Sequence, residues 1–404
     1  MTQSIKLPNN YPLMTMILFW CGLVVLSSMY VTIPLASVLS NTLHVSITQV
    51  AWLASSYSIC YAVGCLLYGP FSDRYGRKLF LVTSISLLTV ITFGIGFVDN
   101  FYGLLILRGL QGLISAAFAP ISLVYAGEMF PPEKRLTAVG FVSSGLLMAG
   151  VVGQVYSGLV NEYLGWQAIF LLLGILYLVT LILIIIYLPK DTMVRPHVPM
   201  MEAFKRMSLL GKQPQILLAF CITFFLLLSL VGMYTILGSY LSIQFGLIEK
   251  DILYVRAAGI IGMLLSLFAG RLAQKLGKTT VLKVGLALSA AGLFGIGVSP
   301  SLPYIIFASI IFVLGIATAN PIVISIVSQL AGHARGSAVS FNAFILFVGA
   351  STGPLLALAL INTGVYILSF SVLGCLLLIG FFLSFFIRLT SSTHVTVMPS
   401  KYYK

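Results

Sequence analysis

The stretch GPFSDRYGRK at residues 69–78 recurs in altered form as GRLAQKLGK at residues 270–278. Each copy lies between two long apolar stretches, and Gln274 of the second copy stands where the first copy has Asp73. The copies are separated by about 200 residues, half of the 404-residue chain. A repeat of this period indicates that two similar units build the fold.

Three further segments repeat at the same distance. They are Ala119-Pro120 with Asn320-Pro321, Arg135-x-x-Ala138-Val139-x-Phe141 with Arg335-x-x-Ala338-Val339-x-Phe341, and Gly153 with Gly353. A long polar segment separates the two halves. The sequence therefore predicts an N-terminal bundle at residues 1–188, a linker at 189–214, a C-terminal bundle at 215–388 and a tail at 389–404.

The composition indicates a membrane protein. Hydrophobic residues make up 59% of the chain and charged residues only 8%, whereas charged residues make up roughly a quarter of a soluble domain. Apolar stretches of about 20 residues recur along the chain, and this is the length of a helix that crosses a bilayer. We expect an all-α membrane protein with about twelve helices, at residues 12–39, 46–71, 78–98, 101–127, 136–162, 166–188, 215–245, 252–274, 279–299, 302–330, 336–362 and 365–388.

The distribution of basic residues predicts the orientation. The net charge of +13 arises mainly from Lys and Arg in short loops on one face, while the opposite face carries Lys250, with Arg256 close to it. Because basic loops stay in the cytoplasm, we expect both termini and the linker there, in an inner membrane. The segment 200–207 (MMEAFKRM) is expected to form a short amphipathic surface helix. The basic charge therefore reflects topology, and nucleic acid is not an expected partner.

The sequence offers no catalytic or metal-binding constellation. The five cysteines lie inside apolar stretches without paired or metal-ligand spacing, and the four histidines are predicted to lie in loops or tails. We therefore expect no enzyme activity, no metal and no cofactor.

The segment 69–78 resembles the signature loop of the major facilitator superfamily at every defining position. The resemblance implies two six-helix bundles related by a pseudo-two-fold axis along the membrane normal. It also implies that the loop acts as a conformational latch made of Gly69, Asp73, Arg74, Gly76 and Arg77. Glycine allows a tight turn and close helix approach, and Asp73 can pair with a cation or cap a neighbouring helix.

The fourth predicted helix contains Leu105-x-x-Arg108-x-x-Gln111-Gly112-x-x-Ser115. This pattern resembles the second signature of the proton-coupled drug exporters of the superfamily, whose arginine is associated with proton transfer. A cation inside the membrane is costly unless it faces water or a partner, so Arg108 is a candidate functional residue. The alternative is a structural arginine bonded to backbone carbonyls.

The fifth predicted helix carries four glycines that resemble the glycine-rich signature of exporters, namely Gly145, Gly150, Gly153 and Gly158. Gln154 stands where that signature has proline, and the intact Gly-Pro pair is instead Gly353-Pro354 in the eleventh predicted helix. A small-residue face for close helix packing explains both helices equally well.

In the superfamily, the substrate cavity is lined mainly by the first, fourth, seventh and tenth helices, with contributions from their neighbours. The resemblance therefore predicts a set of substrate-binding or coupling residues: Arg108, Gln111, Tyr30, Trp52, Tyr57, Tyr61, Gln154, Tyr234, Asn320 and Asn342. Such a set suits an amphipathic organic ligand. Arg256 is a second candidate, after Arg108, for a positive charge in the cavity. Because it lies near an outer helix end, however, its long side chain is expected to snorkel to the surface.

All nine acidic residues are predicted to lie in loops or at helix ends, which leaves a neutral to positive cavity. The interpretation is a monomeric, proton-coupled exporter of a drug or metabolite, working in the bilayer by alternating access. One alternative is a carrier of an organic anion bound by Arg108. From another class, a membrane sensor or a lipid-handling protein could use the same fold.

Overall fold

The computed structural model describes residues 10–190, 213–298 and 301–388, and most of these residues are helical. The predicted surface helix 200–207 and the predicted tail 389–404 lie outside the described residues. The first half contains α1 Tyr11–Tyr30, η1 Ile33–Leu35, α2 Ala36–Leu43, α3 Ile47–Tyr75, α4 Arg77–Ile95, α5 Phe101–Ser115, α6 Phe118–Met129, α7 Pro132–Leu164 and α8 Trp166–Tyr187. The second half contains α10 Pro214–Phe245, α11 Glu249–Leu265, η2 Ser266–Phe268, α12 Ala269–Leu276, α13 Lys278–Val298, α14 Leu302–Leu330, η3 Gly332–Ala334, α15 Arg335–Ile361, α16 Tyr366–Leu383 and η4 Ser384–Phe386.

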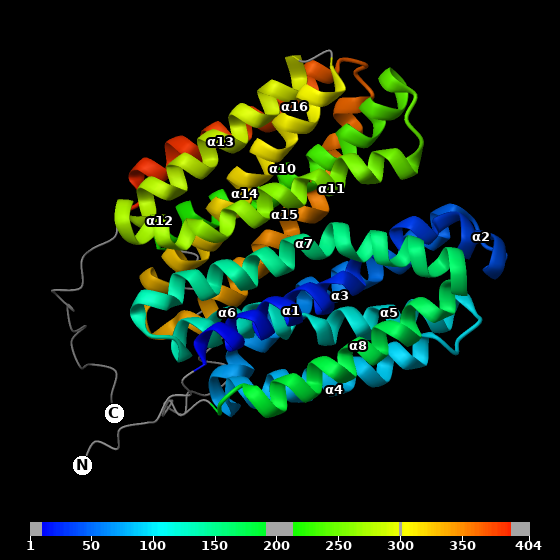
Figure 1. Ribbon diagram of the computed structural model, residues 1–404, viewed down its shortest axis with the longest axis horizontal. Coiled ribbons are helices and arrows are strands. Elements are labelled where there is room, and N and C mark those ends of the chain that lie inside the picture. Colours follow the sequence, from blue (N-terminus) through cyan, green and yellow to red (C-terminus); the bar gives the residue numbers. More distant parts are fainter. Residues whose placement is uncertain (1–9, 191–212, 299–300, 389–404) are drawn as a thin grey trace.

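These elements form two bundles that lie side by side, α1 to α8 in one and α10 to α16 in the other (Figure 1). In the described part of the chain, eleven helical segments are long and apolar enough to cross a membrane. The helix α3 supplies a twelfth, with a shorter apolar stretch at Trp52–Tyr68. The all-α membrane fold predicted from the sequence is therefore confirmed.

Three predicted helices are interrupted. The first ends at Tyr30 and continues as η1 and α2, α5 and α6 are separated at residues 116–117, and η2 separates α11 from α12. The break before α6 has a local cause, because the ring of Pro120 would meet the carbonyl of Ala116 in a continuous helix. Its counterpart Pro321 is accommodated inside the unbroken α14.

Glycines bring α7 close to α1, and α15 close to α10. A Cβ at Gly153 would lie 2.7 Å from the carbonyl oxygen of Ser27, and a Cβ at Gly353 would lie 2.7 Å from the carbonyl oxygen of Leu228. Neither position accepts a side chain at the present helix separation. The same contact therefore occurs in both halves, and it supports the interpretation of these glycines as packing residues.

The two bundles touch along α3 and α15, where the ring centres of Tyr61 and Phe347 lie 4.3 Å apart, and they touch again at one end of the molecule. There Gln274 on α12 donates a hydrogen bond to the backbone oxygen of Glu133 on α7. A Cβ at Gly270 would lie 2.9 Å from the Cα of Thr137. We call this the basic end, and it contains the α3–α4 turn at Gly76 and the α12–α13 turn at Gly277.

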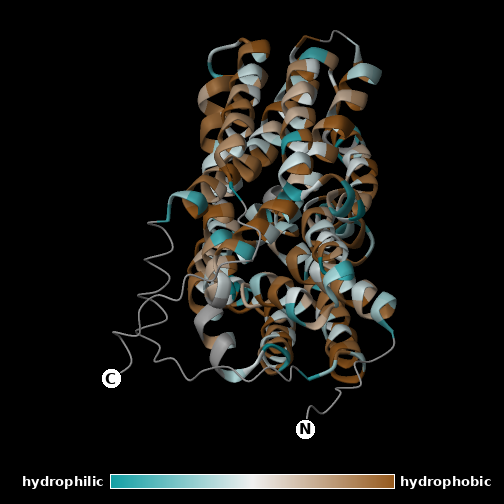
Figure 2. Cartoon of the chain, turned by 90° about the vertical axis from the view of Figure 1, so that its left-hand side faces the viewer, coloured by the Kyte–Doolittle hydropathy of each residue, from teal (hydrophilic) through white to brown (hydrophobic). Residues whose placement is uncertain are grey.

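Apolar side chains dominate the outer surface of the helices. Figure 2 shows hydrophobic residues along most of their length, with hydrophilic residues at scattered positions between them. Large apolar side chains such as Val90, Tyr102 and Leu355 are mainly exposed. An apolar surface of this kind suits contact with lipid. The helices meet the other requirement of a bilayer as well, because each satisfies its backbone polar groups internally.

Candidate functional site

A cavity of about 840 Å³ lies between the two bundles. It is lined by α1, η1, α6 and α7 of the first half and by α10, α11, α14 and α15 of the second. Most of the lining side chains are aliphatic. A mostly apolar cavity of this size matches sites that hold small organic molecules.

The cavity opens away from the basic end. Its lining extends from Val339 and Asn342, in the first third of α15, to Ile33, Glu162 and Tyr254, near the remote helix ends. On the other side, the hydroxyl oxygens of Ser144 on α7 and Ser266 in η2 lie 3.5 Å apart. The contacts at the basic end therefore close the space beneath the cavity.

The lining residues come in pairs that the sequence repeat relates to each other. These pairs are Leu26 with Leu227, Tyr30 with Val231, Ile33 with Tyr234, Ala119 with Asn320, Leu123 with Ile324, Leu146 with Leu346 and Gln154 with Pro354. Equivalent residues of the two halves thus face the same space. The cavity therefore lies across the pseudo-two-fold axis.

Five of the residues predicted to bind substrate line this cavity: Tyr30, Gln154, Tyr234, Asn320 and Asn342. The Nε2 of Gln154 donates to the Gly150 carbonyl at 2.6 Å, which leaves its amide oxygen as an acceptor. The hydroxyl of Thr223 donates to Oδ1 of Asn342 at 2.7 Å, which leaves the amide nitrogen of that side chain as a donor. Asn320 is buried, with 6% of its surface exposed, and yet its Oδ1 has no hydrogen-bond partner among the described residues.

The other five predicted residues are not among those that line the cavity: Trp52, Tyr57, Tyr61, Arg108 and Gln111. The side chain of Arg108 is 1% exposed inside the first bundle. Its Nη1 donates to the carbonyl oxygen of Ser28 at 2.8 Å and to Oε1 of Gln111 at 2.6 Å, and its guanidinium lies 4.5 Å from the ring centre of Tyr57. These contacts match the structural alternative for this arginine.

The sequence pattern placed Arg108 inside the membrane-crossing part of α5 but could not give the rotation of α5 about its axis. After the break at residues 116–117, α6 presents Ala119 and Leu123 to the cavity. Before the break, Arg108 on α5 contacts α1 and α3. A substrate contact by Arg108 therefore stays a prediction that this conformation does not display.

Two charged residues of the lining were not in the predicted set. Glu162 belongs to the last turn of α7 and is exposed at the cavity mouth, because that helix extends to Leu164. Arg256 was expected to snorkel outward. In the structure it lines the cavity instead, and its Nη2 donates to the carbonyl oxygen of Tyr234 at 2.9 Å.

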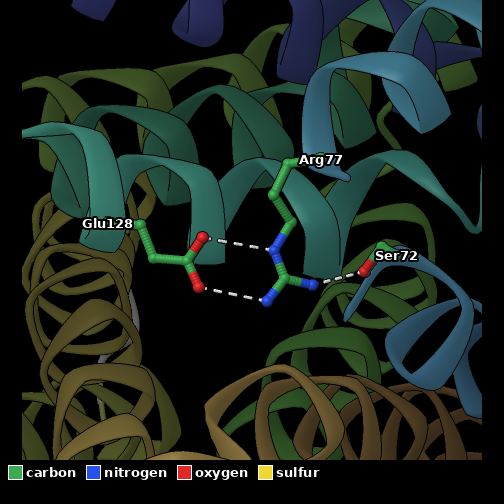
Figure 3. A network of polar contacts seen from close by, with 3 residues as sticks. All are labelled: Ser72, Arg77 and Glu128. Carbon is green, nitrogen blue, oxygen red and sulfur yellow. Dashed lines mark hydrogen bonds and ion pairs between the residues drawn. The ribbon is translucent and has the colours of Figure 1, made fainter. Parts of the chain in front are cut away.

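The repeated turns at the basic end join helices through polar side chains. Gly76 and Gly277 have φ angles of 101° and 85°, so glycine is needed at both turns. Next to Gly76, the buried guanidinium of Arg77 holds the carboxylate of Glu128 in two contacts of 3.1 and 3.4 Å and donates to Ser72 at 2.5 Å (Figure 3). The pair ties the start of α4 to the end of α6.

In the second half the carboxylate of this pair is replaced by a neutral amide, so the contact is a hydrogen bond from a cation and not an ion pair. At the equivalent positions, Nζ of Lys278 donates to Oε1 of Gln329 at 2.8 Å. The side chains of Asp73 and Arg74 lie outside the described residues, so the latch role of Asp73 stays a prediction.

A cavity on the axis between two repeated bundles of membrane-crossing helices defines a membrane transporter built from parallel repeats. The chain belongs to the Major Facilitator Superfamily, because the model of that family matches residues 18–263 and 252–399. The fold class implied by the signature loop is thereby confirmed.

Relatives and solved structures agree with this assignment. The uncharacterized MFS-type transporter YybF of Bacillus subtilis is 27% identical over 341 residues, which cover 83% of this chain and 84% of the relative. The multi-drug resistance efflux pump PmrA of Streptococcus pneumoniae is 26% identical over 343 residues, covering 81% and 84%.

Two solved structures share the fold. The proton:xylose symporter XylE matches with a TM-score of 0.76 and 15% identity, over 94% of this chain and 96% of the other. The human organic anion transporter MFSD10 matches with a TM-score of 0.74 and 14% identity, over 92% and 99%. At these identities the likeness concerns the fold alone.

Proposed function

We propose that the protein is a proton-coupled exporter that moves a small amphipathic organic molecule across the cytoplasmic membrane by alternating access, acting as a monomer. The observation that carries the proposal is the mostly aliphatic cavity on the pseudo-two-fold axis, with a few polar side chains placed in its wall. The similarity to the multi-drug resistance efflux pump PmrA supports export of an amphipathic compound.

The closed basic end supports alternating access. In the present state the cavity opens away from that end, and an opposite state would need the contacts of Gln274 with Glu133 and of Ser144 with Ser266 to separate. Each of these is a single hydrogen bond, whose loss costs little, and the close packing of Gly270 against Thr137 would have to separate with them. This arrangement supports a rocking motion of the two bundles about the cavity.

Export can be tested in proteoliposomes with three dansyl compounds that differ only in charge: dansyl-glycine, its neutral amide and dansyl-cadaverine. We expect an acidic lumen to drive accumulation of at least one compound against its gradient, beyond its level in protein-free liposomes. An ionophore that collapses the pH gradient should abolish this accumulation. Protein-dependent flux that ignores the pH gradient would refute proton coupling, and absence of any protein-dependent flux would refute export of such compounds.

We also propose that both termini and the linker are cytoplasmic, since the basic loops gather on that face. In a chain whose own cysteines have been replaced, a cysteine at Asn41 should react with an impermeant maleimide added to intact cells. A cysteine at Thr396 should react only after the cells are opened. The reverse pattern would show the opposite orientation.

A further inference from the structure

The guanidinium of Arg256 belongs to the wall of the cavity. Arg256 lies on α11, and its Nη2 donates a 2.9 Å hydrogen bond to the carbonyl oxygen of Tyr234 on the neighbouring α10. Both residues line the cavity. A side chain held across these two helices is placed where a ligand between the bundles can reach it.

The depth of this contact differs from that of a snorkelling arginine. Arg256 is two turns into α11 from Glu249, about 10 Å of helix rise. Tyr234 is three turns from the end of α10 at Phe245, about 16 Å of rise. A snorkelling side chain extends toward the helix ends and water. The guanidinium of Arg256 instead contacts a carbonyl at least as deep as its own backbone.

A glycine on α10 makes room for this position. A Cβ at Gly238 would lie 2.6 Å from Nη2 of Arg256, and Gly238 itself lines the cavity. Any side chain at residue 238 would displace the guanidinium from its place beside Tyr234. The local sequence therefore fits the position of the arginine in the wall.

The charged and polar side chains of the cavity wall favour a ligand that combines an anionic group with an apolar part. Among the described lining residues the charged ones are Arg256, which is half-buried, and Glu162, which is exposed at the mouth. The buried Oδ1 of Asn320 lacks a protein donor among the described residues and can accept a hydrogen bond from a ligand. A cationic ligand would be repelled by Arg256, whereas an anionic group would form charge-assisted hydrogen bonds with it.

We propose that Arg256 binds the anionic group of the transported molecule, so that the substrates are amphipathic organic anions. Their apolar part occupies the aliphatic wall and a donor group reaches Asn320. The inference rests on the proposed transport function, since it assigns a substrate class to the same cavity.

The test measures fluorescence anisotropy of the three dansyl compounds with the purified full-length protein in nanodiscs, with empty nanodiscs as a blank. We expect dansyl-glycine to bind about tenfold or more tightly than its neutral amide or dansyl-cadaverine, because only the carboxylate can pair with the guanidinium. Arg256→Gln should abolish this preference, and Arg256→Lys should retain part of it because the charge persists. Arg388→Gln, the same change at an exposed position of the basic end, should leave it unaltered.

Gly238→Ala provides a second variant that keeps the charge. Its Cβ should displace the guanidinium and weaken dansyl-glycine binding severalfold, while binding of the neutral amide stays the same. The inference is overturned if the wild-type protein shows no preference for the carboxylate, if none of the three compounds binds, or if the preference persists in Arg256→Gln.

The outcomes separate this inference from the exporter proposal. A carboxylate preference that depends on Arg256, without accumulation driven by the pH gradient, would support the inference and refute proton-coupled export. Accumulation of dansyl-cadaverine driven by the pH gradient, without binding of dansyl-glycine, would support export and overturn the inference.

Discussion

Gly112→Leu should prevent recovery of folded protein. Gly112 on α5 faces the backbone of α3, where a Cβ would lie 2.8 Å from the carbonyl carbon of Tyr57. Backbone cannot yield as a flexible side chain can, so α5 and α3 must separate, at a cost of about 3 kcal/mol or more. The measurement is the yield of monodisperse protein after extraction in mild detergent, together with its apparent melting temperature.

Gly127→Leu is the matched control, because a Cβ at Gly127 on α6 meets no atom within 4 Å. We expect it to give close to the wild-type yield. Similar yields for the two variants would show that close contact between α3 and α5 is not required for folding.

Arg77→Met should lower stability by about 3–5 kcal/mol, because the largely buried carboxylate of Glu128 loses its bidentate partner. The matched substitution in the second half, Lys278→Met, removes one hydrogen bond between partly exposed neutral and charged groups. It should cost about 1 kcal/mol. Thermal unfolding of both purified variants measures the difference.

Arg77→Lys is the charge-conserving variant of this site, because an ammonium group keeps an ion pair with Glu128. It should be considerably more stable than Arg77→Met, which leaves the carboxylate without this cation. Equal losses for Arg77→Met and Lys278→Met would contradict the buried ion pair as a stabilising contact.

The sequence predicted the fold through features that need no knowledge of side-chain direction. Apolar length predicts a crossing helix, and a repeated loop motif predicts two related bundles. The interruptions were harder to predict, because Pro120 and Pro321 occupy equivalent places yet only the first follows a break. The sequence patterns therefore predicted where the helices lie, but not which of them are interrupted.

The site was only partly predictable, since lining a cavity depends on how each helix is rotated. Tyr30, Asn320 and Asn342 lie on faces that meet between the bundles, whereas Arg108 lies on a face of α5 that packs inside its own bundle. Arg256 was misread because sequence position gives the depth of the Cα but not the direction of a long side chain. The glycine at residue 238 was the available signal, and it is seen only when α10 and α11 are placed together.

The lining pairs also determine how many ways a ligand can be held. Each polar member faces an apolar counterpart across the axis, as Tyr30 faces Val231, Tyr234 faces Ile33 and Asn320 faces Ala119. Two identical halves would offer any molecule two equally favourable poses, related by half a turn about the axis. Here such a turn would move ligand groups that contact Tyr30, Tyr234 or Asn320 against the hydrocarbon of Val231, Ile33 or Ala119. We therefore expect a bound molecule to favour one orientation, with its polar end directed to the same wall of the cavity while the bundles move around it.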